Sequence, residues 1–276
     1  MYWMLKWLLL GPLVRIVTRP AVTGTLPRRG PLIVAANHLA EIDSLVLGVT
    51  LGRRLTFVAK SEYFGRGGLR GRLYGTLCRA TGQIPIERGG GARGDVGLAA
   101  ARSVLDAARA WAIYPEGTRS PDGCLYRGRT GVMRVALSRP QAAVVPVGIQ
   151  GTAAIDHPRR RLWRPGRVRV MIGNPVDLSR WAGRADDPAA WREATDELMR
   201  AIQALTSQRY VDRYPTREET ARRDGRTEHA LSHGEAPQAD RPGQAPRGCC
   251  QHGHPVLRGG LDHRWPPLQS MASAPG

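Results

Sequence analysis

Short apolar runs alternate with amphipathic stretches along most of the chain. Six runs are apolar and bounded by proline, glycine or polar residues, which is typical of buried strands. These runs are 31–37, 55–59, 83–86, 110–114, 142–149 and 168–172. Helical patterns cover 44–51, 69–79, 95–108 and 131–138, and a further helix opens at Asp187-Pro188. The alternation predicts an α/β fold: a single domain with a largely parallel sheet flanked by helices.

The two ends of the chain differ from this domain, which we place at 23–213. Residues 1–22 combine tryptophan, tyrosine and aliphatic residues with Lys6, Arg15 and Arg19, and Gly11-Pro12 interrupts them. This mixture predicts an amphipathic segment at a membrane interface, although a helix packed on the domain's own core is an alternative. Residues 214–276 are rich in proline, glycine and histidine and poor in aliphatic residues, which predicts a disordered tail.

Charge narrows the classes of partner. Lysine and arginine number 41 against 23 acidic residues, a net charge of +18, and only Lys6 and Lys60 are lysines. An arginine-rich surface favours lipid headgroups, phosphorylated small molecules or nucleic acid. The spacing of the four cysteines indicates neither a disulfide framework nor a metal site. No run of 18 apolar residues marks a transmembrane helix.

Candidate chemistry begins where the first long strand ends. In NHLAEID, His38 follows the strand and Asp43 comes five positions later, before an apolar helix. On one helix this offset would point the two side chains apart, but across a turn they can meet. The carboxylate can then hold the histidine Nδ1 proton and leave Nε2 as a general base. A solvated histidine and a helix-capping aspartate would give the same spacing.

A second group of polar residues follows the strand at 110–114. The turn PEGTRS supplies Glu116, Gly117, Thr118 and Arg119, and its arginine, hydroxyls and backbone N–H groups suit a phosphate monoester. Glu116 is unusual there, because a carboxylate repels phosphate unless it binds a hydroxyl or orients an arginine. Arg88 closes a short strand in GQIPIER. Taken singly, Arg88 and the proline of VVPVGI are also compatible with a solvated arginine and an edge strand.

In this order, NHLAEID, GQIPIER, YPEGTRS and VVPVGI resemble the four sequence blocks of the glycerophospholipid acyltransferases, which include the 1-acylglycerol-3-phosphate acyltransferases. The resemblance covers about residues 23–180. It implies transfer of a fatty acyl group from acyl-CoA or acyl-carrier protein to a hydroxyl of 1-acylglycerol-3-phosphate in phospholipid biosynthesis. The second block departs from the usual pattern at Pro85 and Glu87, and Tyr114 replaces the commoner phenylalanine, but no proposed functional group is lost.

The resemblance also implies roles for individual residues. By position, His38 is the catalytic base and Asp43 its orienting partner. The acceptor-binding residues are Arg88, Glu116, Gly117, Thr118 and Arg119, with Lys60 ranked below the arginines, and Pro146 marks the acyl-donor region. No cofactor and no metal are expected.

Partners and location follow from the same expectation. The predicted partners are an anionic phospholipid surface, the acyl donor and a lysophospholipid acceptor, with no nucleic acid, and the predicted location is peripheral or monotopic, at the cytoplasmic face of the cell membrane. Three alternatives remain: a different lysolipid or polar acceptor, a non-catalytic lipid-binding protein, and a basic nucleic-acid-binding protein. Aromatic residues make up only 6% of the chain, and no nucleic-acid-binding motif is present, which counts against the last alternative.

Overall fold

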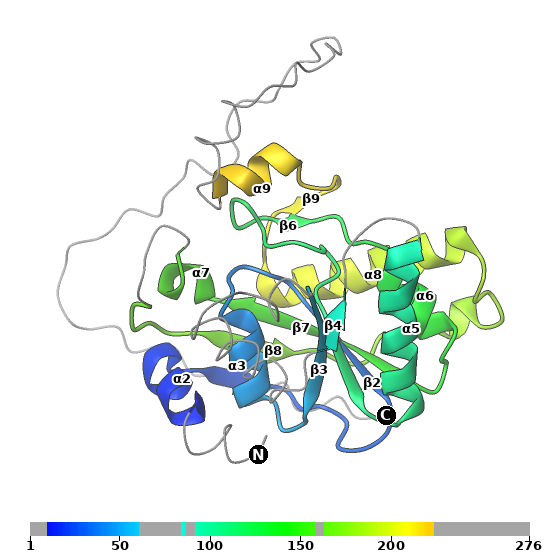
Figure 1. The fold of residues 1–276 in the computed structure, drawn as a ribbon, viewed down its shortest axis with the longest axis horizontal. Helices are drawn as coiled ribbons and strands as arrows, with labels where there is room; N and C mark the ends of the chain where they lie inside the picture. The colour runs from blue at the N-terminus through cyan, green and yellow to red at the C-terminus, as the bar shows by residue number, and fades with distance from the viewer. Residues whose placement is uncertain (1–9, 61–83, 87–91, 158–162, 224–276) are drawn as a thin grey trace, which may run out of the picture. The chain divides into compact units, whose positions relative to one another are not determined.

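The computed structural model describes residues 10–60, 84–86, 92–157 and 163–223. Its main element is a seven-stranded sheet with the order β1-β8-β7-β2-β5-β3-β4 (Figure 1). The strands are β1 (Ala21–Thr23), β2 (Leu32–Ala36), β3 (Leu55–Lys60), β4 (Ile84–Ile86), β5 (Ala110–Ile113), β7 (Ala143–Gln150) and β8 (Arg169–Ile172). Neighbouring strands run parallel except for β7 and β8, so the predicted α/β fold with a largely parallel sheet is confirmed.

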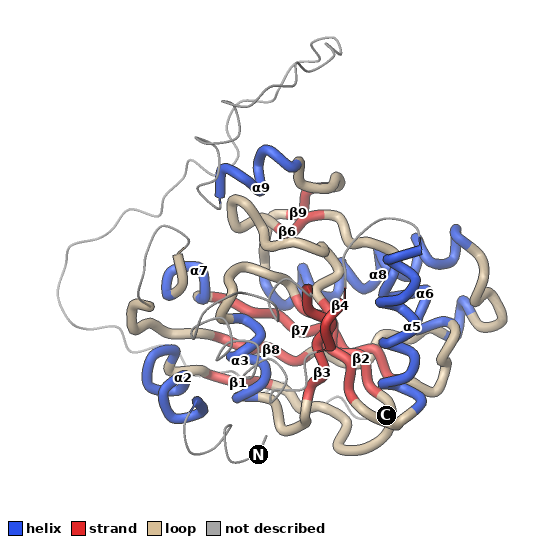
Figure 2. The backbone as a smooth tube through the Cα atoms, in the orientation of Figure 1, coloured by secondary structure: helices blue, strands red, loops and turns tan. Residues whose placement is uncertain are grey.

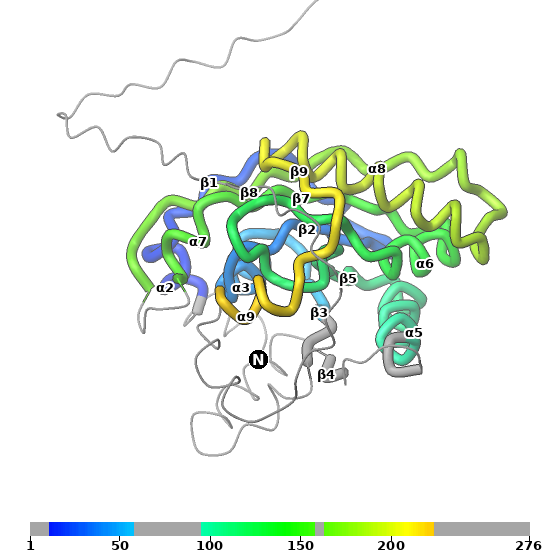
Figure 3. Tube along the Cα trace, turned by 90° about the horizontal axis from the view of Figure 1, so that it is seen from above, coloured from blue at the N-terminus to red at the C-terminus, as the bar shows by residue number. Residues whose placement is uncertain are grey.

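Helices cover both faces of this sheet, as Figures 2 and 3 show. All five residues of β2 are buried, and alternate side chains enter two separate apolar cores. On one face lie α2 (Leu10–Thr18), α3 (Asp43–Thr50) and α7 (Thr152–Ile155), and on the other lie α5 (Ala92–Asp106), α6 (Gly131–Leu137) and α8 (Pro188–Thr206). A 3-10 turn, Ser179–Trp181, buries Trp181 in the second core.

The predicted elements correspond to observed ones wherever the structure describes them. Each of the six apolar runs contains a strand, and α8 begins at Pro188 with the Asp187 carboxylate accepting the Ala189 N–H. The helix expected at 69–79 lies outside the described residues.

The segment before β1 differs from its prediction at one point. Helix α2 includes Gly11 and Pro12 instead of breaking there, because a proline in the first helical turn removes an N–H that has no partner within the helix. Val14 is fully buried against the first core, whereas Leu13 and Ile16 are 51% and 70% exposed. The helix therefore packs on the domain and also presents apolar side chains to the outside. Residues 1–9 lie outside the described residues.

The structure describes a helix within the first residues of the segment predicted to be a disordered tail. Residues 214–223, its first ten, lead into and contain α9 (Arg217–Arg223), which follows a small parallel sheet of β6 (Leu125–Tyr126) and β9 (Tyr210–Val211). Figure 1 shows α9 just beyond β9 along the chain. Polar contacts hold the helix, and none of its residues is buried, which is why apolar content did not reveal it. Residues 224–276 lie outside the described residues.

The sheet brings the polar segments together. Strands β2, β3, β5 and β7 run in one direction, so the residues after each strand meet at one edge of the sheet. Asn37 secures this edge: its side chain is fully buried, donates to the Ile149 carbonyl and accepts the Ile149 N–H at 2.9 and 2.7 Å. The backbone leaving β2 is thereby fixed to β7 immediately before His38.

Candidate active site

His38 and Asp43 lie on opposite sides of the turn that joins β2 to α3. The distance from His38 Nδ1 to Asp43 Oδ2 is 2.9 Å, so the contact expected from their spacing is confirmed. The Asp43 side chain is fully buried, whereas 17% of the His38 side chain is exposed. Because Nδ1 faces the carboxylate, Nε2 is the ring nitrogen that can exchange a proton with a substrate.

The turn itself is held by a dense set of hydrogen bonds. Asp43 Oδ2 also accepts the N–H groups of Leu39 and Ala40, at 2.6 and 2.8 Å. The His38 carbonyl accepts the Ser120 N–H at 2.8 Å, and the Ile42 N–H donates to Asp156 at 3.0 Å. The histidine is therefore presented by a backbone with little freedom to shift, as general-base catalysis requires.

Tyr114 forms one wall of the site. Its ring stacks on the His38 imidazole, with centroids 3.9 Å apart and planes 8° from parallel, and its hydroxyl lies 2.9 Å from Ser44 Oγ. Burial lowers the pKa of His38 below its ordinary value of 6.5, and the hydrogen bond to Asp43 opposes this change. The neutral imidazole, which is the form able to accept a proton, is thus favoured near neutral pH.

Glu116 supports the histidine turn through hydrogen bonds to the backbone. The side chain is 1% exposed, and its two oxygens accept the N–H groups of His38 and Tyr126, at 3.0 and 2.9 Å. Burial raises the pKa of Glu116 to about 8. The structure corrects the acceptor contact expected from sequence, since this enclosed carboxyl group accepts two backbone N–H groups and so supports the histidine turn.

The rest of the PEGTRS turn lies beside His38. Gly117 has φ of +75°, and a Cβ atom there would approach Arg129 Nε to 2.8 Å, so the tight turn requires glycine. Thr118 is half-buried. Arg119 Nη1 lies 2.9 Å from the Glu41 carboxylate, which is itself 62% exposed. The arginine therefore reaches over the turn between His38 and Asp43.

Of the three other predicted residues, the structure describes the positions of Lys60 and Pro146 but not that of Arg88. Lys60 ends β3 at the same sheet edge, and Arg88 lies outside the described residues. Pro146 is buried in β7, paired with Ala35 and adjacent to the point where the β8 ladder starts at Val147. A proline in a central strand is tolerated there because it lies just outside that antiparallel ladder. Its role at the donor site stays a prediction.

The domain that carries this site is similar to known proteins. The family model "Acyltransferase" matches residues 19–150, which contain His38, Asp43 and the PEGTRS turn. The matched residues are similar to the acyltransferase family, and the named relatives support a relation to the glycerophospholipid acyltransferases. The mouse 1-acyl-sn-glycerol-3-phosphate acyltransferase alpha is 28% identical over 153 residues, which cover 54% of this chain and 51% of the mouse protein.

Two further relatives extend the comparison. The lyso-ornithine lipid O-acyltransferase of Rhizobium meliloti (strain 1021) is 31% identical over 169 residues, covering 57% of this chain and 52% of that protein. The crystal structure of PlsC, the 1-acyl-sn-glycerophosphate acyltransferase from Thermotoga maritima, superposes with a TM-score of 0.54 at 22% identity, covering 71% of this chain and 78% of that one. It shows the shared fold. The chain spans about half the length of the curated relatives it matches.

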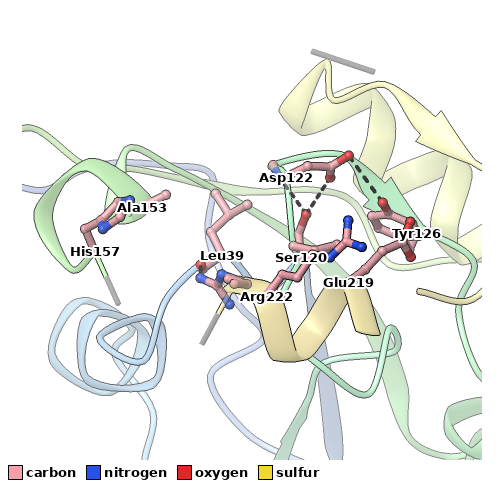
Figure 4. Close-up of a pocket in the computed structure, with 11 residues that line it drawn as sticks. Leu39, Ser120, Asp122, Tyr126, Ala153, His157, Glu219 and Arg222 are labelled. Carbon is pink, nitrogen blue, oxygen red and sulfur yellow. Dashed lines mark hydrogen bonds between the residues drawn. The ribbon is translucent and has the colours of Figure 1, made fainter. Parts of the chain in front are cut away.

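An open cavity of about 610 Å³ lies next to the histidine turn of the acyltransferase domain. Figure 4 shows the loop with Ser120, Asp122 and Tyr126 on one side and Ala153 with His157 on another. Asp122 accepts from Ser120 Oγ and Tyr126 Oη, at 3.4 and 3.2 Å, and so orders that loop. Leu39, the residue after His38, also lines the cavity.

Sequence reasoning missed two contributors to the acyltransferase site. The sequence marks Tyr114 only as a variant of the usual phenylalanine, and its stacking on His38 is seen only in the structure. Arg223 was assigned to the tail, yet its guanidinium donates to the Leu39 carbonyl, 184 residues away. The signal that could have revealed α9 is the capping-box pattern of Thr216 and Glu219, which marks a helix start.

Proposed function

We propose that the protein transfers a fatty acyl group from acyl-CoA or acyl-carrier protein to the hydroxyl of 1-acylglycerol-3-phosphate, with His38 as general base. The observation that carries this proposal is the 2.9 Å contact between His38 Nδ1 and Asp43 Oδ2 at the carboxyl edge of the sheet. The match to the family model and the names of the relatives support the reaction class.

The proposed chemistry needs two proton transfers and no covalent enzyme intermediate. His38 Nε2 takes the proton of the acceptor hydroxyl as that oxygen attacks the thioester carbonyl carbon. Asp43 stabilises the imidazolium that forms. When the tetrahedral intermediate collapses, the carbon–sulfur bond breaks, and the imidazolium returns its proton to the leaving thiolate. The products are the ester and a free thiol, so protons and electrons balance.

Arg119 is the proposed contact for the phosphate of the acceptor. In the structure it faces Glu41, and an ion pair this exposed contributes at most about 1 kcal/mol. A phosphate monoester carries more charge and offers several acceptor oxygens to a guanidinium. The substrate can therefore replace Glu41 at small cost. Thr118 and the N–H groups of the turn, with Gly117 at its tip, would complete the phosphate contacts, together with Arg88 and Lys60 as predicted from sequence.

A second acceptor class follows from one relative. The 31% identical Rhizobium protein is named for a lyso-ornithine lipid. Acylation of such a phosphate-free lysolipid by the same histidine is the alternative function, and it differs from the first in requiring no arginine contact to phosphate.

Association with an anionic membrane is also part of the proposal. Leu13 and Ile16 project from α2, with Arg19 exposed at its end, as an interfacial helix requires. Arg15 has another contact: its guanidinium donates to the Val49 carbonyl at 3.2 Å and holds α2 against α3. Among the helices that the structure describes, none is long and apolar enough to cross a bilayer. We place the protein peripherally at the cytoplasmic face of the cell membrane.

The deciding experiment is a transfer assay with a thiol reagent. Purified protein is incubated with acyl-CoA or acyl-carrier protein and with 1-acylglycerol-3-phosphate, a lyso-ornithine lipid or a neutral monoacylglycerol. The proposal expects thiol release that depends on the phosphate acceptor and falls roughly 10²- to 10⁴-fold in His38→Ala. Equal turnover by folded His38→Ala protein would show that the histidine is not the base. Preference for the lyso-ornithine lipid would select the second acceptor class.

A further inference from the structure

Helix α9 lies beyond the region matched by the family model and is built almost entirely from polar contacts. Thr216 and Glu219 form a reciprocal capping box, in which the Thr216 N–H donates to the carboxylate at 2.8 Å and the Glu219 N–H donates to the hydroxyl at 3.1 Å. Arg213 donates to both oxygens of Glu219, at 2.9 and 2.6 Å. The hydrogen bonds from Arg213 lower the pKa of Glu219 to about 2. The start of the helix is therefore well defined.

The other end of α9 reaches the active site. Arg223, its last residue, donates from Nη2 to the carbonyl of Leu39, the residue that follows His38. Other contacts already hold this turn: Glu116 accepts the His38 N–H, and Asp43 accepts the Leu39 N–H. These two contacts hold backbone N–H groups of the turn. The guanidinium of Arg223 adds a hydrogen bond to a backbone carbonyl of the same turn, that of Leu39.

Arg222 provides a natural comparison on the same helix. Its guanidinium pairs with Glu218 one turn earlier, and both side chains are about two-thirds exposed, at 68% and 67%. Arg222 and Arg223 have the same charge and adjacent positions, but of their two hydrogen bonds described here only that of Arg223 is made to the histidine turn. Variants at these two positions can therefore separate the effect of the contact with Leu39 from the effect of positive charge on the helix.

We propose that Arg223 is a positioning residue for His38, which holds the Leu39 carbonyl and so fixes the turn that presents the imidazole to the acceptor hydroxyl. The helix α9 is then part of the active site. This inference rests on the proposed function for its catalytic consequence, whereas the contact with the turn does not depend on it.

The charge of Arg223 gives the proposal a measurable signature. The groups that face His38 are Asp43 from α3, Tyr114 from the end of β5, Glu116 and Arg119 from the loop after it, and Arg223 from α9. Burial lowers the pKa of His38 most, Asp43 raises it, and the positive charges of Arg119 and Arg223 lower it further. Removing the charge of Arg223 should therefore raise this pKa.

The test is an NMR titration of ¹³C-labelled histidine in the full chain, with His38→Gln used to assign the His38 signal. Arg223→Ala should move the titration of His38 to higher pH, Arg223→Lys should leave it close to wild type because the charge remains, and Arg222→Ala should leave it unchanged. This measurement needs no turnover, so it decides the inference even if the proposed reaction fails.

The transfer assay adds the catalytic consequence. Arg223→Ala should lower kcat/KM roughly 10- to 100-fold, the loss expected when a charged hydrogen bond that orients a catalytic group is removed. Arg223→Lys should recover part of this loss, and Arg222→Ala should stay within about twofold of wild type. Equal effects of the two alanine variants, or an unchanged His38 titration in Arg223→Ala, would overturn the inference. Full activity of His38→Ala would instead remove the proposed function.

Discussion

At the scale of single residues, one carboxylate oxygen organises the site. Asp43 Oδ2 accepts from the imidazole and from two backbone N–H groups, all within 2.9 Å. These three contacts define the ring orientation, the tautomer and the shape of the turn together. Neutralising Asp43 should disturb all three, so Asp43→Asn should lower transfer almost as much as loss of the proposed base His38.

The pH dependence of transfer should reflect His38. Because burial lowers the pKa of His38, kcat/KM should rise with pH to a plateau, with the midpoint of the acid limb below 6.5. Asp43→Asn removes an influence that raises this pKa, so its acid limb should move to still lower pH while the plateau falls. A wild-type midpoint above 6.5 would contradict the first expectation, and an upward move in the variant would contradict the second.

Arg119 and Glu41 give a paired prediction on the acceptor. Arg119→Lys keeps the charge but loses the planar pair of donors, so kcat/KM for 1-acylglycerol-3-phosphate should fall by about one to two powers of ten. Glu41→Gln removes the competing carboxylate and should lower the acceptor KM by at most about fivefold, since the exposed pair is weak. A neutral monoacylglycerol serves as control. Equal losses for both acceptors in Arg119→Lys would exclude a phosphate contact.

Glu116 should govern stability more than substrate binding. In Glu116→Gln the amide NH₂ would face a backbone N–H, so one buried donor loses its partner and the free energy of unfolding should fall by about 1 to 3 kcal/mol. The folded-state pKa of about 8 lies above the ordinary 4.5, so Glu116 contributes stability that is complete below pH 4.5 and is lost as pH rises toward 8. Urea titrations across this range should decline less in Glu116→Gln than in wild type.

At the scale of elements, the strands and the helices were the most predictable parts. Each apolar run became a strand because buried parallel strands need nothing beyond continuous apolar residues and flanking turns. The partners His38 and Asp43 were found because both lie within one turn. Glu116 was misread, because its burial depends on N–H groups supplied by β6 and by the histidine turn. Arg223 acts across 184 residues, and no local pattern encodes such a contact.

Helix α2 can be tested through its exposed apolar face. Ile16→Glu places a negative charge on the side chain that is 70% exposed and should weaken co-sedimentation with anionic vesicles. Val96→Glu is the matched control, because Val96 is 61% exposed but lies on α5, across the sheet from α2. Equal binding by the two variants would mean that α2 does not face the lipid.

Helix α9 sets the position at which the chain can be shortened. A chain ending at residue 226 keeps α9 and should retain transfer activity, since the residues removed offer few apolar side chains. A chain ending at Tyr214 loses α9 together with Arg223 and should lose roughly as much activity as Arg223→Ala. Thermal melts would verify that both chains are folded, and full activity in the shorter one would contradict a role for α9.

At the scale of the whole molecule, two features depend on electrostatic interactions. The chain carries a net charge of +18, and α9 has no buried residue and is held by polar contacts. The Arg213 and Glu219 pair that anchors α9 is partly exposed to solvent, and ion pairs at the surface weaken as the salt concentration rises. The two apolar cores are not sensitive to this effect. If α9 and the basic surface act as proposed, a rise in ionic strength should slow transfer and weaken binding to anionic vesicles while the domain stays folded.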